Sequence, residues 1–210
     1  MIIIISSAKT MNLKSIEKEY KPNFEVITNK ITEDFLNGNL TNKSYRAIDL
    51  YNGMVFKNLN RDIWDEEDYE YASNKLFILS ALYGVVKAND GIKPYRLDFT
   101  KNGSKLYKQW NEVSDYLVNI DSEILNLASN EFSSMLDFSK FKRVVDVEFY
   151  ENKNSTLSKH STISKKGRGL LSGWIIKNKI NDFEKLKQFN LLGYKFIKDL
   201  SDDNKLVFVR

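Results

Sequence analysis

The chain begins with a run of four isoleucines, residues 2–5, and this run constrains the fold more than any other feature of the sequence. A short, uninterrupted β-branched segment is typical of a strand that is buried on both faces within a sheet. A small polar segment, residues 6–10, follows directly. The start of the chain therefore predicts a central strand that ends in a polar loop at one edge of a sheet.

Apolar runs and helical patterns interleave along the rest of the chain, which predicts an α/β fold. Further strands are expected at residues 77–82, 123–128, 143–150, 194–197 and 206–209. Helices are expected at residues 24–36, 42–51, 104–120 and 170–180, and after the acidic start at 65–68. Because the elements do not follow a strict strand–helix–strand rhythm, we expect a mixed sheet surrounded by helices rather than a doubly wound parallel one.

Length and composition favour one domain that spans residues 1–210. No Pro/Gly/Ser-rich linker divides the chain, which contains two prolines. The absence of cysteine excludes thiol catalysis and Cys-based metal sites, and the single histidine, His160, is expected to be exposed. We therefore predict no metal and no cofactor. The first residues have neither the basic region nor the long apolar run of a targeting or membrane segment, so we expect a cytoplasmic protein without membrane association.

Charge is segregated along the chain, on top of a formal net charge of +4. Residues 62–70 contain six acids, which are typical of a helix start because carboxylates suit its positive end. Residues 152–181 contain no acid but seven bases: Lys153, Lys159, Lys165, Lys166, Arg168, Lys177 and Lys179. Such a stretch is either a solvated face or the electrostatic footprint of polyanion binding, and the sequence leaves both interpretations open.

The segment Lys165-Lys166-Gly167-Arg168-Gly169 is the strongest candidate for an anion site. It combines side-chain cations with flexible glycines, and it directly precedes the helix expected at residues 170–180. The free N–H groups at a helix start favour an anion. We therefore predict that this segment binds phosphate or another anion at the start of the helix.

Three other segments carry weaker signals. Lys9 and Thr10 follow the first strand, but their loop lacks the glycines of a nucleotide-binding P-loop, so they either line a cleft or simply pack. Gly84 lies in an apolar–Gly–apolar turn like that of helix–hairpin–helix modules, or only satisfies a positive φ. Arg96 either holds an anion or pairs with Asp90 or Asp98.

Several ordered blocks together make the chain resemble the YaaA family of bacterial peroxide-stress proteins. The blocks are residues 5–10, 79–85, 92–97, 106–110, 126–132 and 165–170, with Phe189 and residues 193–196 near the end. The resemblance covers nearly the whole chain. It implies a compact α/β fold with a positively charged cleft, a helix–hairpin–helix-like element and duplex DNA binding. It also implies a role in limiting damage from hydrogen peroxide by keeping unincorporated iron low.

The leading hypothesis is a cytoplasmic oxidative-stress protein that binds duplex DNA without sequence specificity, and the sequence leaves open whether the protein catalyses a reaction. Lys165, Lys166 and Arg168 are predicted to neutralise phosphates. The other predicted contributors to the same cleft are Lys9, Thr10, Lys87, Tyr95 and Arg96.

The alternative hypothesis is an enzyme that acts on a small phosphorylated or nucleobase-like substrate. Lys9, Arg96 and Arg168 would then form an anion pocket together with Thr10, and Tyr83 or Tyr95 would donate a proton. A deep, closed cleft around Lys9 would favour this alternative, whereas an open groove would favour DNA. Direct iron sequestration is a third possibility, which one histidine and no cysteine support poorly.

Overall fold

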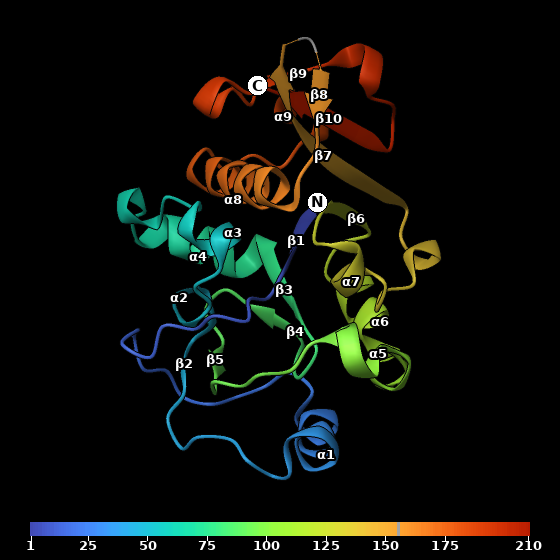
Figure 1. The fold of residues 1–210 in the computed structure, drawn as a ribbon. Helices are drawn as coiled ribbons and strands as arrows, with labels where there is room; N and C mark the ends of the chain where they lie inside the picture. Colours follow the sequence, from blue (N-terminus) through green and yellow to red (C-terminus); the bar gives the residue numbers. More distant parts are fainter. Residues whose placement is uncertain (155) are drawn as a thin grey trace.

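The isoleucine run forms β1 (Ile2–Ser6), an inner strand of an eight-stranded mixed sheet (Figure 1). The computed structural model describes residues 1–154 and 156–210. The order of the strands in the sheet is β4-β3-β1-β6-β7-β10-β9, and β8 pairs with β7. The other strands are β3 (Leu76–Ser80), β4 (Gly84–Lys87), β6 (Glu123–Leu127), β7 (Arg143–Lys153), β8 (Thr156–Ser158), β9 (Lys195–Phe196) and β10 (Lys205–Val209).

Five neighbouring strands of this sheet, β3, β1, β6, β7 and β10, are parallel, whereas β4, β8 and β9 pair antiparallel with their neighbours. The prediction of a mixed sheet is therefore confirmed. A separate two-stranded sheet joins β2 (Tyr45–Arg46) to β5 (Gly91–Ile92).

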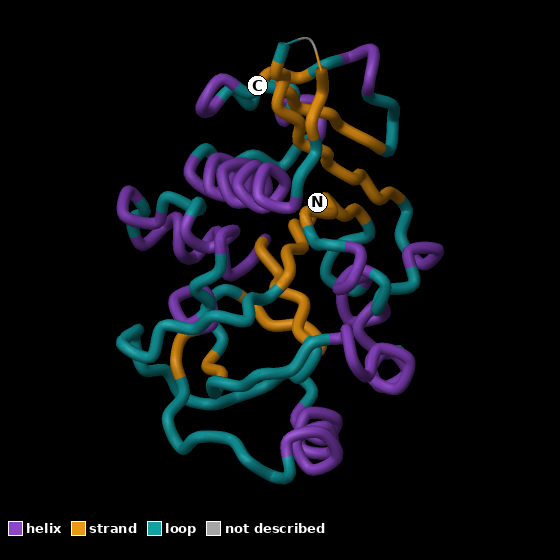
Figure 2. Tube along the Cα trace, viewed as in Figure 1, coloured by secondary structure: helices purple, strands orange, loops and turns teal. Residues whose placement is uncertain are grey.

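Helices surround the sheet (Figure 2). They are α1 (Glu25–Leu36), α2 (Ala47–Leu50), α3 (Met54–Lys57), α4 (Glu66–Lys75), α5 (Phe99–Tyr107), α6 (Glu112–Val118), α7 (Asn130–Ser133), α8 (Ser161–Lys177) and α9 (Phe183–Leu186). Short 3₁₀ turns occur at η1 (Arg61–Ile63), η2 (Lys108–Trp110), η3 (Phe138–Lys140), η4 (Leu191–Gly193) and η5 (Lys198–Leu200). No helix within the described ranges is both long and apolar enough to span a membrane.

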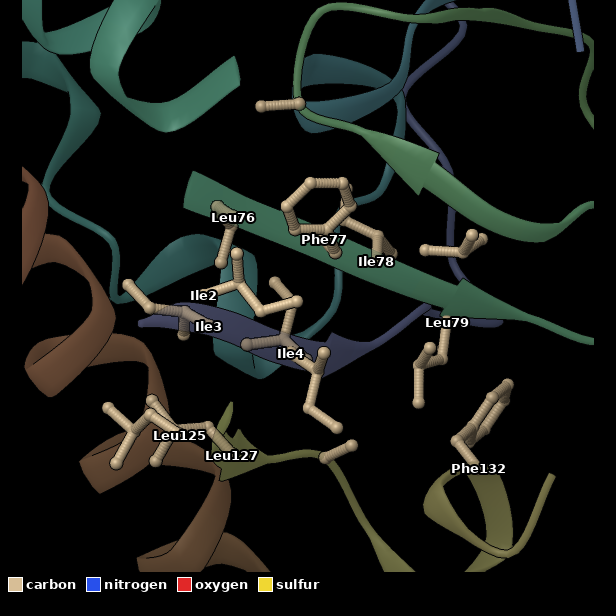
Figure 3. Packing of buried hydrophobic residues seen from close by; sticks show 14 of the residues in the cluster. Ile2, Ile3, Ile4, Leu76, Phe77, Ile78, Leu79, Leu125, Leu127 and Phe132 are labelled. Carbon is tan, nitrogen blue, oxygen red and sulfur yellow. The ribbon is translucent and has the colours of Figure 1, made fainter. Parts of the chain in front are cut away.

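The core is built around β1 (Figure 3). All four isoleucines are at most 1% exposed, so both faces of the strand are covered, as the sequence predicts. Ile3 pairs with Leu76 of β3 on one side and with Leu125 of β6 on the other. Burial of large apolar side chains in this cluster supplies most of the driving force for folding.

Two predicted helices differ from the structure. Within residues 42–51, where one helix is expected, Tyr45 belongs to strand β2 and pairs with Ile92, and only Ala47–Leu50 is helical. The expected helix at 104–120 is interrupted by the 3₁₀ turn η2. In that turn the indole of Trp110 is fully buried and donates a hydrogen bond to the Ala81 carbonyl at 3.1 Å.

The apolar–Gly–apolar turn at Gly84 connects two strands, not two helices. β3 and β4 form an antiparallel hairpin in which Ser80 pairs with Gly84. Gly84 has φ = +68°, and a Cβ atom there would lie 2.6 Å from the Trp110 ring. The positive-φ interpretation is thus confirmed, and the prediction of a helix–hairpin–helix turn in this segment is wrong.

Candidate functional site

The order of the parallel strands locates the site. From β1 the chain first adds β3 on one side and later adds β6, β7 and β10 on the other. The order of connections therefore reverses between β1 and β6. In open α/β sheets, ligands bind in the crevice at the carboxyl ends of the strands where this reversal occurs. β1 and β6 end there with Ser6 and Leu127.

A cavity of about 340 Å³ lies at this position, and we call it the inner cavity. The loop after β1 and the end of β6 form one part of its wall, and α3, α8, α7 and the segment before α5 complete it. It is lined by Ser6, Ser7, Ala8, Lys9, Thr10, Gly53, Met54, Val55, Phe56, Leu97, Asp98, Leu127, Ser129, Glu131, Phe132, Lys165 and Arg168. In Figure 1, α3 and α8 lie on one side of β1, and β6 and α7 lie on the other.

Hydroxyl groups connect the two strands beside the cavity. The Ser129 N–H donates to Ser6 Oγ at 2.9 Å, and the two serine hydroxyls are 3.1 Å apart. Asn126 Oδ1 accepts from the Ala128 N–H at 3.0 Å, which fixes the turn that follows β6. These contacts hold the ends of β1 and β6 together, so the base of the cavity is rigid.

A second, more open depression of about 440 Å³ adjoins the inner cavity, and we call it the outer groove. The two share Thr10, Gly53 and Met54. The other residues that line the outer groove are Asn52, Lys57, Asn58, Thr162 and Lys166. Its charged residues, Lys57 and Lys166, are both basic.

The segment Lys165–Gly169 lies inside α8, which begins at Ser161 rather than at residue 170. Its backbone N–H groups are therefore used within the helix, and the prediction of an anion site at a helix start is wrong. The side chains nevertheless reach the site. Lys165 and Arg168 line the inner cavity, and Lys166 lines the outer groove.

The glycines of this segment serve packing rather than flexibility. A Cβ atom on Gly167 would lie 2.3 Å from the Phe149 ring, and one on Gly169 would lie 2.3 Å from the Val55 carbonyl oxygen. Likewise, a Cβ atom on Gly173 would lie 2.1 Å from the Leu59 carbonyl oxygen. The missing side chains let α8 pack directly against α3 and β7, and this packing brings its cations to the cavity.

The seven bases of the acid-free stretch separate into two groups. Four form ion pairs with acids elsewhere in the chain: Lys153 with Glu151, Lys159 with Glu148, and Lys177 and Lys179 with Asp68. Lys165, Lys166 and Arg168 form no ion pair with any residue that the structure describes. The three remaining cations are those that line the inner cavity or the outer groove.

The guanidinium of Arg168 is held in an unfavourable environment. Its Nε atom is buried and has no hydrogen-bond partner among residues 1–154 and 156–210. Burial lowers the pKa of Arg168, and the nearby carboxylates Asp146 and Glu148 oppose this effect. A buried donor without a partner costs on the order of 1–3 kcal/mol.

Lys9 lines the cavity, but its charge is already balanced. Its Nζ lies 2.6 Å from Asp98 Oδ2. Asp98 also caps α5 by accepting from the Thr100 N–H at 2.9 Å. The contacts with Lys9 and Thr100 lower the pKa of Asp98 to about 2. Thr10 is likewise engaged, because its hydroxyl donates to the Asn52 carbonyl at 3.0 Å.

Lys87, Tyr95 and Arg96 do not line either depression. Lys87 ends β4 and pairs with Phe77, near the opposite end of β3 from the cavity. Arg96 is exposed, and its predicted partner Asp98 pairs with Lys9 instead. These three residues are therefore not among those that line the two depressions with Lys9 and Arg168.

The Tyr95 hydroxyl is hydrogen-bonded to other hydroxyl groups and does not line the cavity. It lies 2.7 Å from Ser80 Oγ and 3.0 Å from the Tyr51 hydroxyl. Burial raises the pKa of Tyr95, and the Ser80, Tyr51 and Ser7 hydroxyls oppose the effect. Tyr83 is also buried, and its hydroxyl donates to the Lys93 carbonyl at 3.0 Å. Neither phenol is placed to donate a proton directly into the inner cavity.

Sequence reasoning missed the contribution of α3 and of residues 127–132. Met54, Val55, Phe56 and Lys57 line the site from a four-residue helix that has no clear sequence signal. Glu131 adds a carboxylate, and one of its oxygens accepts from the Phe99 N–H at 3.3 Å. His160 is exposed, as predicted. The described side chains contain no cluster of three or more His, Cys, Asp or Glu that could hold a metal.

Comparison with known proteins identifies relatives over nearly the whole chain. Residues 27–200 match the family model described as peroxide stress protein YaaA. A UPF0246 protein of Legionella pneumophila (strain Corby) is 34% identical over 96% of this chain and 86% of its own length. A UPF0246 protein of Crocosphaera subtropica is 34% identical over 100% of both chains. A third, from Fusobacterium nucleatum, is 32% identical over 100% of this chain and 99% of its own.

Proposed function

The chain belongs to the peroxide stress protein YaaA family, and we propose that it binds duplex DNA through the outer groove and the adjoining basic face of α8. The binding is directed at phosphates and is largely independent of base sequence. The proposal includes a cytoplasmic role in limiting damage from hydrogen peroxide and unincorporated iron. The family description supports the peroxide part of this role.

One observation carries the proposal. Lys57, Lys165, Lys166 and Arg168 lie on two helices that pack against each other, and none of them pairs with a described carboxylate. Unpaired cations on a rigid surface can release counterions from DNA without first breaking internal ion pairs. The outer groove is also more open than the inner cavity.

Fluorescence anisotropy with a labelled duplex at about 50 mM salt tests the proposal. Lys57→Gln and Lys166→Gln should each weaken binding roughly tenfold, because each removes one phosphate contact. Lys185→Gln is the matched control, since Lys185 is exposed on α9 and outside both depressions. It should bind as the wild type does. The absence of binding by the wild-type protein at this salt concentration would refute the proposal.

The inner cavity favours a second candidate function, an enzyme that acts on a small phosphorylated or nucleobase-like substrate. The cavity contains Lys9 and Arg168 and combines polar groups with apolar side chains, as small-molecule sites do. Chromatography of deoxynucleoside monophosphates after incubation with the protein would detect released phosphate or base. No release over several hours would remove this candidate.

A further inference from the structure

The inner cavity has the size, position and chemistry of a site for one nucleotide. We propose that it binds a single nucleoside monophosphate unit, either free or as a nucleotide turned out of duplex DNA. The second source rests on the proposed DNA binding, whereas the first is independent of it. The phosphate is held by Arg168 and Lys165, and the sugar and base lie against the apolar wall.

The size and lining of the cavity together favour a small phosphate ester. A volume of about 340 Å³ is near the lower end of the range for small-molecule sites. A duplex cannot enter such a space and must remain in the outer groove. Inorganic phosphate would leave most of the apolar wall in contact with water. A phosphate ester that carries one ring system can place its phosphate beside the cations and its ring against the apolar wall of the cavity.

The phosphate position follows from the two cations on α8. Arg168 and Lys165 are three residues apart, so they project from the same face of the helix. The guanidinium of Arg168 is a planar fork that binds phosphate through two parallel hydrogen bonds. Its Nε lacks a partner among the described residues, and burial lowers the pKa of Arg168, although the nearby carboxylates Asp146 and Glu148 oppose this effect. Lys9, by contrast, is already paired with Asp98.

The apolar part of the wall comes from three different elements. Val55 and Phe56 belong to α3, Leu97 precedes α5, and Phe132 lies in α7. Phe56 and Phe132 are 2% and 7% exposed, so these rings are fixed in position. The half-buried Val55 and Leu97 expose the apolar surface against which a sugar or base can pack. Ser7 and Glu131 supply hydrogen-bonding groups for the polar edge of a base.

The position of the cavity agrees with this assignment. The parallel strands follow the order β3-β1-β6-β7-β10, which corresponds to the doubly wound order 2-1-3-4-5. In that arrangement a mononucleotide cofactor binds where the connections reverse, between the first and third strands. The equivalent position here is between β1 and β6, where the cavity lies.

Calorimetric titration with the four deoxynucleoside monophosphates tests the proposal. At least one should bind to a single site, and at least about tenfold more tightly than either inorganic phosphate or the matching nucleoside. Arg168→Met should weaken this binding at least about tenfold by removing the phosphate contact. Leu97→Trp should block the cavity without changing charge. Circular dichroism melts of both variants verify folding, and Lys185→Gln should bind as the wild type does.

A second pair of probes distinguishes the two sources. A duplex with one mismatched base turns that base out at lower cost than a fully paired duplex. Tighter binding of the mismatched duplex, lost in Leu97→Trp, would assign the site to DNA. Equal binding of the two duplexes, together with nucleotide binding, would assign it to free nucleotides.

The proposal is overturned if none of the four nucleotides binds at millimolar concentration and the mismatch gives no advantage. It is also overturned if a folded Arg168→Met binds nucleotides as the wild type does. Binding of the paired duplex, measured in the same samples, reports on the proposed DNA binding separately. Nucleotide binding without duplex binding would therefore refute the proposed function and leave the nucleotide site standing.

Discussion

At the scale of single residues, ion pairs decide which cations remain for a ligand. Asp68 is the clearest case. Its side chain is 1% exposed and lies 2.7 Å from Lys177 Nζ, and it also pairs with Lys179. The acidic run at 62–70 and the end of the basic stretch thus neutralise each other. The sequence predicted the capped start of α4, which a reciprocal capping box of Asp65 and Asp68 confirms, but not its basic partners.

The Asp68 pair predicts a defined pH dependence of stability. Burial opposes ionisation, but Lys177, Lys179 and the Asp65 backbone lower the pKa of Asp68 from 3.8 to about 2. A lowered pKa stabilises the folded state above the unfolded pKa, and this contribution disappears as the pH falls from about 4 to 2. In urea unfolding, the free energy of unfolding of the wild type should therefore fall by up to about 2 kcal/mol more than that of Asp68→Asn over this pH interval.

Asp34→Asn is the control for this prediction, because Asp34 is exposed on α1 and outside the ion pairs described above. It should retain the wild-type pH dependence. If Asp68→Asn and wild type lose stability in parallel, the carboxylate of Asp68 does not titrate as described.

At the scale of elements, the glycines of α8 hold the site together. Gly169 and Gly173 are four residues apart and face the backbone of residues 55–59. From sequence alone, the glycines beside lysines indicate a flexible segment at the start of the helix expected at residues 170–180, because glycine weakens a helix by about 1 kcal/mol relative to alanine. The benefit that offsets this cost is close contact with α3. That contact joins segments far apart in the chain, so local sequence patterns do not reveal it.

Gly173→Ala should therefore destabilise the protein by about 1–3 kcal/mol, because its Cβ would meet the Leu59 carbonyl oxygen at 2.1 Å. The matched control is Gly103→Ala in α5, where the nearest atom, Tyr107 Cε2, would be 3.1 Å away and would have to shift by only a few tenths of an ångström. Thermal melts should show a lower midpoint for Gly173→Ala and an unchanged or higher one for Gly103→Ala. Equal midpoints for Gly173→Ala and wild type would show that α8 does not need this close contact.

At the scale of the whole molecule, strand order creates the site. The sequence predicted the buried strands and the mixed sheet, since short apolar runs carry that information. It could not predict that β6 returns beside β1, because strand pairing is decided by contacts between distant segments. The same limit explains the candidate residues. Lys9, Thr10, Lys165, Lys166 and Arg168 line the two depressions, whereas Lys87, Tyr95 and Arg96 do not, although Lys9 and Arg96 carried similarly weak local signals.

The salt dependence of duplex binding tests the central proposal most directly. With the two outer-groove cations, Lys57 and Lys166, in contact with phosphates, a plot of log K against log salt for the wild type should have a slope of about −1.8. The double variant Lys57→Gln/Lys166→Gln should have a slope near zero. A wild-type slope near zero, or the same steep slope in both proteins, would contradict DNA binding through the outer groove.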